Sequence, residues 1–264
     1  MRRYQLFEWE DQPWLPVVLR DYLTDHLRFF LGSDQARPLH QAIASILFRS
    51  MQKLGTREIV DLCSGGGGPL LAVQRYLHEE MNFETTVILT DLYPNVTAFE
   101  QAELSSKGDV KIYREPLSAF DVPPSLTGMR TLFTAFHHFR PSDAKRILID
   151  ARAKRRGIAI FEPFNRSFRM AYNMGIGGIK RGFLLTPKVG RMSFKRFSAA
   201  YLLPVAPMIF AWDGVVSSLR SYTVPELRNL ASFAEADDFI WEAGQVPTTP
   251  DGSMPLTYLV GLPG

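Results

Sequence analysis

Short apolar runs alternate along most of the chain with longer segments whose apolar side chains recur at helical spacing. The runs near residues 59–62, 87–89, 110–113, 130–139 and 157–162 are of strand type, and two more near 239–242 and 256–260 close the chain. Helical spacing is clearest over residues 17–31, 38–54, 70–79 and 141–150. This alternation predicts an α/β protein with a parallel sheet, and ligands of such sheets bind outside the carboxyl ends of the strands.

The first predicted strand runs directly into four glycines, Gly65 to Gly68, and a helical pattern follows Pro69. Glycine lets the backbone take positive φ and lets a ligand approach the main chain. Free amides at the start of the next helix favour a negative or electron-rich group. Since a tight turn with no ligand would also use glycines, the loop alone does not decide between a structural and a binding role.

The second predicted strand ends on Asp91, within Thr-Asp91-Leu-Tyr-Pro. Neighbouring parallel strands end at the same edge of a sheet, so this carboxylate is expected to face the glycine loop. An acid there can accept hydrogen bonds from both hydroxyls of a ribose. The loop and the acid together favour a cofactor that contains a nucleoside.

On these residues the sequence resembles the class I S-adenosylmethionine-dependent methyltransferases, whose first motif reads approximately acid-x-Gly-x-Gly-x-Gly. Here the motif is Asp61-Leu-Cys63-Ser-Gly65-Gly-Gly67, with Cys63 where the first glycine usually stands. The resemblance covers about residues 57–163 and, more loosely, the C-terminal hairpin. It implies a Rossmann-like three-layer sandwich with a seven-stranded, mostly parallel sheet. It further implies an N-terminal helical cap over residues 1–56 and a methyltransferase domain over 57–264 with a lid insertion at about 163–215.

The resemblance also implies that S-adenosylmethionine is the cofactor. Asp91 would hold its ribose, Gly65 and Gly67 would approach its methionine end, and the backbone around Leu117 would contact the adenine, because Pro116 stands where the family has an acid. The expected cofactor-binding residues are Asp61, Ser64, Gly65, Gly67, Asp91, Leu92, Leu117 and Phe136.

Methyl transfer from a sulfonium needs little beyond orientation of the acceptor, which can supply roughly 7–11 kcal/mol of barrier reduction. A base is needed only if the acceptor must lose a proton. His137 and His138 are the catalytic candidates, because imidazole titrates near neutrality and both fall at the end of the fourth predicted strand. Neighbours on a strand point to opposite faces, so at most one of the two should reach the acceptor, and the resemblance favours His138.

The segment 163–212 carries eight basic side chains and no acidic one, and its last part is apolar. Three interpretations stay open: a solvated face over a core helix, a lid that lines a pocket for a hydrophobic small molecule, or a peripheral contact with an anionic membrane. The candidate substrate-binding residues are Trp14, Glu162, Tyr201, Trp212 and Asp213. Trp14 could equally fasten the N-terminus, and Glu162 and Asp213 could make ordinary structural hydrogen bonds.

Composition changes this picture little. A chain of 264 residues with 46% hydrophobic content can bury a full core, and a net charge of +3 is too small to argue for nucleic acid. The single cysteine cannot form an internal disulfide, which favours the cytoplasm, and no signal peptide or membrane-spanning run is recognisable. The five histidines show no ligand-like spacing, and His137 and His138 should diverge on a strand, so we expect no metal site.

The sequence therefore predicts methyl transfer from S-adenosylmethionine to an oxygen or nitrogen atom of a small, hydrophobic acceptor. An S-adenosylmethionine-binding module without methyl transfer and an RNA methyltransferase are the alternatives. The second is disfavoured because residues 135–139 lack the Asn/Asp-Pro-Pro-aromatic motif of enzymes that methylate base amino groups. Moreover, carbon-5 pyrimidine methylation needs a cysteine nucleophile near this site, and Cys63 lies in the predicted cofactor loop.

Overall fold

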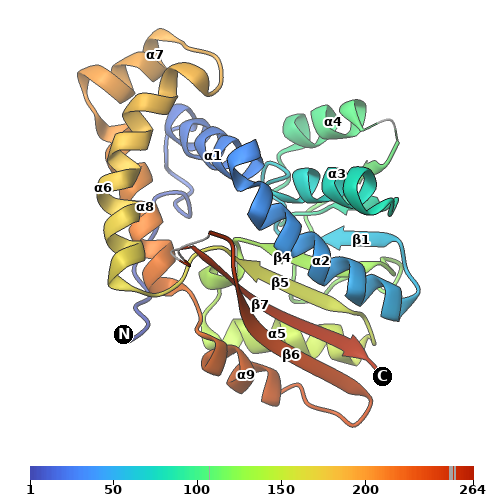
Figure 1. Cartoon of the computed structure of the whole chain (residues 1–264). Helices are drawn as coiled ribbons and strands as arrows, with labels where there is room; N and C mark the ends of the chain where they lie inside the picture. The colour runs from blue at the N-terminus through green and yellow to red at the C-terminus, as the bar shows by residue number, and fades with distance from the viewer. Residues whose placement is uncertain (107, 250–251, 253) are drawn as a thin grey trace.

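The computed structural model describes residues 1–106, 108–249, 252 and 254–264. Within these ranges, one seven-stranded sheet has the order β3-β2-β1-β4-β5-β7-β6 (Figure 1). Its strands are β1 (Glu58–Asp61), β2 (Thr86–Leu89), β3 (Val110–Ile112), β4 (Met129–Phe133), β5 (Ile158–Glu162), β6 (Phe239–Pro247) and β7 (Pro255–Pro263). Neighbouring strands pair in parallel from β3 to β5, whereas β7 is antiparallel to both β5 and β6.

Helices cover both faces of the sheet (Figure 1). One face carries α2 (Arg37–Leu54), α3 (Leu70–Met81) and α4 (Val96–Ser105), and the other carries α5 (Pro141–Ala153) and α9 (Val224–Ser232). Because strand side chains alternate, Ile59 enters the first core and Val60 the second. The predicted α/β sandwich with a mostly parallel seven-stranded sheet is confirmed. The predicted boundary at residue 56 stays a prediction, and α2 packs into the same core as the sheet.

The predicted helices at the N-terminus correspond to α1 (Val17–Gly32) and α2, which are joined by the short 3₁₀ helix η1 (Asp34–Ala36). The strand predicted over residues 130–139 is wrong in its second half. β4 stops at Phe133, Thr134 takes a φ of 52°, and the 3₁₀ helix η2 (Phe136–His138) follows. Because a positive φ cannot continue an extended strand, His137 and His138 lie on a turn at the end of the sheet.

The insertion folds into a helical arm beside the sheet (Figure 1). It consists of α6 (Phe168–Leu185), the 3₁₀ helix η3 (Thr186–Lys188), α7 (Phe194–Phe197), the π-helical turn η4 (Ser198–Leu202) and α8 (Val205–Arg220). Glycines let α6 and α8 approach closely, since a Cβ at Gly178 would lie 3.0 Å from the Ala211 Cα and one at Gly182 only 2.9 Å from the Pro207 Cβ. Among the described helices, none alone could cross a membrane, although the bent pair Phe194–Leu202 and Val205–Arg220 passes the length and composition test together.

The N-terminal segment, residues 1–16, precedes α1 and runs along α8. The Tyr4 amide donates to the Leu219 carbonyl at 3.2 Å, and the Trp212 indole donates to the Phe7 carbonyl at 3.1 Å. Trp9 stacks edge-on against Trp14, with ring centroids 5.6 Å apart. The two hydrogen bonds fasten the N-terminal segment to α8, and the contact between Trp9 and Trp14 folds the segment on itself.

Candidate functional site

The glycine loop leaves β1 at the carboxyl edge of the sheet and is braced by buried polar groups. The Asp61 Oδ1 atom accepts a hydrogen bond from the Thr131 hydroxyl at 2.7 Å, and the Ser64 hydroxyl donates to the Asp61 carbonyl at 3.0 Å. Burial raises the pKa of Asp61 to about 7, against the opposing effect of the hydrogen bonds from Thr131 and Ser64. Asp61 and Ser64 therefore position the loop from its interior side, where both side chains are buried.

Asp91 faces this loop, as the sequence predicts. Its Oδ2 atom accepts from the Gly65 amide at 2.8 Å, and its Oδ1 atom accepts from the Tyr93 amide at 2.8 Å. Each carboxylate oxygen keeps a second lone pair, so the group can still accept from ribose hydroxyls. No atom lies within 4 Å of the position that a Cβ on Gly65 would take. Leu92 and Tyr93 are 43% and 85% exposed beside Asp91 and offer apolar surface to a purine, so these residues fit a nucleoside.

Helix α1 covers the other side of the glycine loop. A Cβ on Gly66 would lie 3.1 Å from the Thr24 methyl and 3.0 Å from the Arg28 Cδ. The Thr24 hydroxyl in turn donates to Glu10 Oε1 at 3.4 Å, and burial raises the pKa of the Glu10 carboxyl. The N-terminal segment thus lies next to the loop, with a partly buried acid at the contact.

Two expected cofactor residues are placed differently. The Leu117 side chain is buried, and its amide already donates to the Asp91 carbonyl at 2.8 Å, so that amide is not available to an adenine. Phe136 is fully buried in the core under α5 and α9, with its ring centroid 5.6 Å from that of Tyr222. Neither side chain faces the open edge at Asp91.

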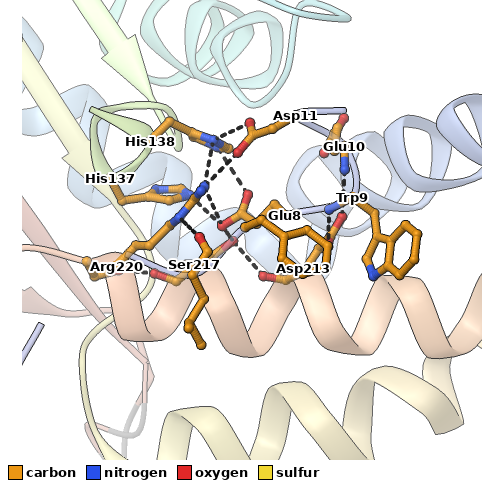
Figure 2. A network of polar contacts seen from close by, with 12 residues as sticks. Glu8, Trp9, Glu10, Asp11, His137, His138, Asp213, Ser217 and Arg220 are labelled. Carbon is orange, nitrogen blue, oxygen red and sulfur yellow. Dashed lines mark hydrogen bonds and ion pairs between the residues drawn. The ribbon is translucent and has the colours of Figure 1, made fainter. Parts of the chain in front are cut away.

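Figure 2 shows a dense polar cluster around the two histidines of η2. The His137 amide donates to Glu162 Oε1 at 3.1 Å, and the His137 Nδ1 lies 2.8 Å from Glu162 Oε2. The His138 Nδ1 lies 2.9 Å from Asp11 Oδ1. The two imidazole centroids are only 4.3 Å apart. The expectation that the histidines diverge is wrong, because they lie on a tight turn and their rings face the same cluster.

Glu8, from the N-terminal segment, enters the cluster beside the two imidazoles and faces their Nε2 atoms (Figure 2). Its carboxylate lies 3.9 Å from His137 Nε2 and 3.5 Å from His138 Nε2, and it accepts a hydrogen bond from the Ser217 hydroxyl at 3.1 Å. Arg220 completes the cluster with one guanidinium nitrogen 3.3 Å from Glu8 and 2.8 Å from Asp11.

The charges of this cluster act on its titratable groups. Burial alone would lower the pKa of His138. The Glu8 and Asp11 carboxylates outweigh this effect, and the pKa is raised to about 9. Burial would raise the pKa of Asp11, yet His138 and Arg220 hold it well below its usual range. At neutral pH the metal-free cluster therefore contains a protonated His138 between two carboxylates.

Asp213 joins the N-terminal segment to α8 at the edge of this cluster (Figure 2). Its two carboxylate oxygens accept from the amides of Trp9 at 2.8 Å and Glu10 at 3.0 Å. Burial raises the pKa of Asp213 to about 7, although these two hydrogen bonds oppose the shift.

The structure brings together some of the predicted site residues and separates others. Glu162 and Asp213 lie at the histidine cluster. Trp14 is 63% exposed, and Trp212 is 41% exposed on the surface of α8. The Tyr201 hydroxyl donates to the Phe183 carbonyl at 2.9 Å within the arm. Glu162, by contrast, is buried against His137.

Sequence reasoning missed Glu8, Asp11, Ser217 and Arg220 as members of the cluster. No motif joins them, and more than 120 positions separate Glu8 from His137. The acid-rich run Glu8-Trp-Glu-Asp11 was the one local signal, since two of its three carboxylates now face the histidines.

No protein-family model and no curated protein matches this sequence. Among solved structures, it is similar to the methyltransferase domain of bacterial CtHen1 in two forms, each with a TM-score of 0.50. The CN form is 9% identical over 87% of this chain and 100% of that one, and the C form is 11% identical over 88% and 100%. The CurJ carbon methyltransferase also has a TM-score of 0.50, with 11% identity over 85% of this chain and 54% of that one. With the strand order, these similarities define the fold: it is that of the class I S-adenosylmethionine-dependent methyltransferases.

Proposed function

We propose that this chain binds S-adenosylmethionine and transfers its methyl group to a small, hydrophobic acceptor. One observation carries the proposal: at the carboxyl edge of a methyltransferase-type sheet, the Asp91 carboxylate lies on the bare Gly65 amide with open space in front of it. An acid and a side-chain-free turn at this edge suit a ribose and the chain attached to it.

In this proposal Asp91 accepts from the ribose hydroxyls, the main chain at Gly65 lies against the methionine end, and Leu92 contacts the adenine. The bound cofactor supplies a methyl group on a positively charged sulfur. The partly buried Glu10 carboxylate, next to Thr24 and the glycine loop, would face that positive end. If the acceptor must lose a proton, the base that we propose is the neutral form of His138, whose side chain is 29% exposed whereas that of His137 is 2% exposed. Because the pKa of His138 is raised to about 9, this base should become available only at alkaline pH.

Calorimetry with S-adenosylmethionine or its demethylated product tests whether the chain binds this cofactor. We expect micromolar binding by the unmodified chain and at least 100-fold weaker binding by Asp91→Ala, because two hydrogen bonds to a charged group are lost, each worth about 1.5–3 kcal/mol. Asp109→Ala, an exposed acid at the start of β3 and thus at the opposite edge of the sheet, is the matched control and should bind normally. Absence of binding at millimolar ligand would overturn the proposal.

Mass spectrometry of cell extract supplied with the protein and an isotopically labelled donor tests the transfer itself. A labelled small molecule of low polarity is the expected product. Cofactor binding without any labelled product would instead favour a binding module, and label in RNA would favour the alternative of an RNA methyltransferase.

The exposed side chains of the helical arm support the proposal that the acceptor is hydrophobic and lies at a lipid surface. Its exposed apolar side chains include Phe168, Tyr172, Ile176, Leu184, Phe194 and Met208, each at least 57% exposed. The exposed Lys180, Lys188, Arg191 and Lys195 lie on the same arm, and residues 163–212 contain no acid. Apolar side chains among basic ones suit the headgroup region of an anionic bilayer. We therefore propose peripheral contact of the arm with an anionic membrane, from which the acceptor is drawn.

Flotation with vesicles tests this contact. We expect binding to vesicles that contain an anionic phospholipid, weaker binding at high salt, and no binding to purely zwitterionic vesicles. Phe194→Ser should reduce binding several-fold, whereas Leu104→Ser should not, because Leu104 is similarly exposed, at 85% against 80% for Phe194, but lies on α4 outside the arm. Equal binding by the two variants would contradict the proposed surface.

A further inference from the structure

The lone pairs of the two histidines point the same way. The Nδ1 atom of His137 faces the Glu162 carboxylate at 2.8 Å, and that of His138 faces the Asp11 carboxylate at 2.9 Å. A carboxylate accepts but does not donate, so the Nδ1 atom of His137 carries the proton. The Nδ1 atom of His138 also lies 3.3 Å from a guanidinium nitrogen of Arg220, and we assign the proton to this Nδ1 as well because the Asp11 oxygen is nearer. In the neutral form, both Nε2 atoms then present lone pairs toward the interior of the cluster.

What the two Nε2 atoms face is another acceptor, the carboxylate of Glu8. Its oxygens lie 3.9 Å from His137 Nε2 and 3.5 Å from His138 Nε2. The His137 Nε2 is buried and has no hydrogen-bond partner among the described residues. Lone pairs of two neutral imidazoles would repel this carboxylate unless a cation lay between them, and that cation is either a metal ion or a proton on His138 Nε2.

From this arrangement we infer that Glu8, His137 and His138 hold one divalent transition-metal ion, with Glu162 and Asp11 orienting the two imidazoles. The inference goes beyond the proposed methyl transfer and does not depend on it. The three ligand atoms lie within 4.8 Å of one another. A tetrahedral ion bound at about 2.0–2.2 Å sets its ligand atoms roughly 3.4 Å apart, so atoms that now lie within 4.8 Å of one another must close by up to about 1.4 Å.

The surroundings match those of known metal ligands. Ligating histidines usually donate their second ring nitrogen to a carboxylate, which fixes the tautomer and makes the imidazole more basic. Both histidines here have that outer partner, on two different segments of the chain. Two imidazoles and one carboxylate favour Zn²⁺ or another first-row ion over Mg²⁺ or Ca²⁺, which prefer oxygen ligands.

Charge balance supports a divalent ion. Glu8, Asp11 and Glu162 carry three negative charges, and Arg220, which contacts Glu8 and Asp11, carries one positive charge. With neutral imidazoles the sum is −2, which a divalent cation brings to zero. Ser217 and Arg220 bond to Glu8 Oε1, while Oε2 is the oxygen nearest His138 and is the one that we assign to the metal.

A bound ion would join the N-terminal segment to the end of β4, because Glu8 precedes α1 and both histidines follow β4. The ion would occupy the lone pairs of both histidines, so neither could then act as a base. An acceptor that must lose a proton would in that case be acidified by the metal.

Titration of the full-length, tag-free chain with Co²⁺ after chelator treatment tests the site. We expect one equivalent to bind, with visible absorption bands of a four- or five-coordinate ion, and Zn²⁺ to displace it. His138→Gln and Glu8→Gln should each weaken binding at least 100-fold, and Asp11→Asn about 10-fold or more, as for outer partners in general. His78→Gln, an exposed histidine on α3, is the control and should bind as the unmodified chain does.

A second measurement keeps the test independent of altered folding. Protease cleavage within residues 1–16 should slow at least several-fold when Zn²⁺ is added to the unmodified chain, and it should not slow in His138→Gln, whose 29% exposed side chain can be replaced without opening the core. Unchanged Co²⁺ affinity in both ligand variants, or no stoichiometric binding by the unmodified chain, would overturn the metal site and leave a protonated His138 as the cation of the cluster.

Discussion

The glycine-loop edge and the histidine cluster lie at the same end of the sheet but are built in opposite ways. The first is largely main chain, with one carboxylate and an open position in front of Gly65. The second is a buried set of charged side chains from the N-terminal segment, η2, β5 and α8. An open edge can receive a ligand without rearrangement, whereas the buried cluster must first satisfy its own charges.

This difference indicates separate roles. Hydrogen bonds at the glycine loop position a backbone turn, and substitutions there should change binding more than stability. Hydrogen bonds in the cluster hold distant segments together, so substitutions there should change stability first. Two acids, Asp91 and Glu162, represent the two regions and allow a direct comparison.

Glu162→Ala should give the largest effect on stability, a loss of about 3 kcal/mol in the free energy of unfolding. The change removes the acceptor of both the His137 amide and Nδ1, and each buried donor left without a partner costs about 1–3 kcal/mol. Asp91→Ala, in the partly exposed edge, should lose less than half as much. Urea denaturation at pH 7 measures both, and equal losses would contradict the division of roles.

The pH dependence of stability should reveal the buried acid under the glycine loop. Burial raises the pKa of Asp61 to about 7, and an unfolded aspartate titrates near 3.9. Between pH 4 and 7 the folded chain therefore binds one more proton at this site than the unfolded chain. The free energy of unfolding should fall as the pH rises, by up to about 1.4 kcal/mol per pH unit, and this contribution should level off above pH 7.

Asp61→Asn should remove that contribution while keeping the acceptor for the Thr131 hydroxyl. Asp213, whose pKa is also about 7, supplies a similar contribution from the cluster, so Asp213→Asn should remove an equal share of the slope. Asparagine keeps one acceptor oxygen where the Trp9 and Glu10 amides need two, so only Asp213→Asn should also be less stable at pH 4. Unfolding curves at several pH values give the slope of the free energy of unfolding against pH. If neither variant reduced this slope, its assignment to Asp61 and Asp213 would be refuted.

The smallest expected effect concerns Gly65. Its φ of 55° costs an alanine roughly 1–2 kcal/mol. Gly55, at the C-terminus of α2, has a φ of 64° and likewise no atom near its Cβ position, so Gly55→Ala should lose a similar amount. Only Gly65→Ala should also weaken the binding of S-adenosylmethionine, because the methyl group of the new alanine enters the proposed binding space. Calorimetry and thermal unfolding of the pair separate backbone strain from ligand exclusion.

Local patterns predicted the parts of this molecule whose residues are neighbours in sequence. The glycine loop and the acid after β2 were both legible, because each is marked by residues close together in the sequence. The fourth strand was predicted too long, since an apolar run does not reveal that Thr134 turns to positive φ. The roles expected of Leu117 and Phe136 depended on tertiary orientation, and the structure turns both into the core.

By itself the sequence determined the alternation of strand and helix and the pairing of a bare turn with Asp91, because hydrophobic periodicity and glycine content act over short distances. Only the tertiary structure decided that Glu8, Asp11 and Arg220 meet His137 and His138. The physical reason is that such a cluster forms when α8 and the N-terminal segment are packed against the end of β4. Side chains that far apart in sequence carry no shared pattern, and only packing determines which of their charges become neighbours.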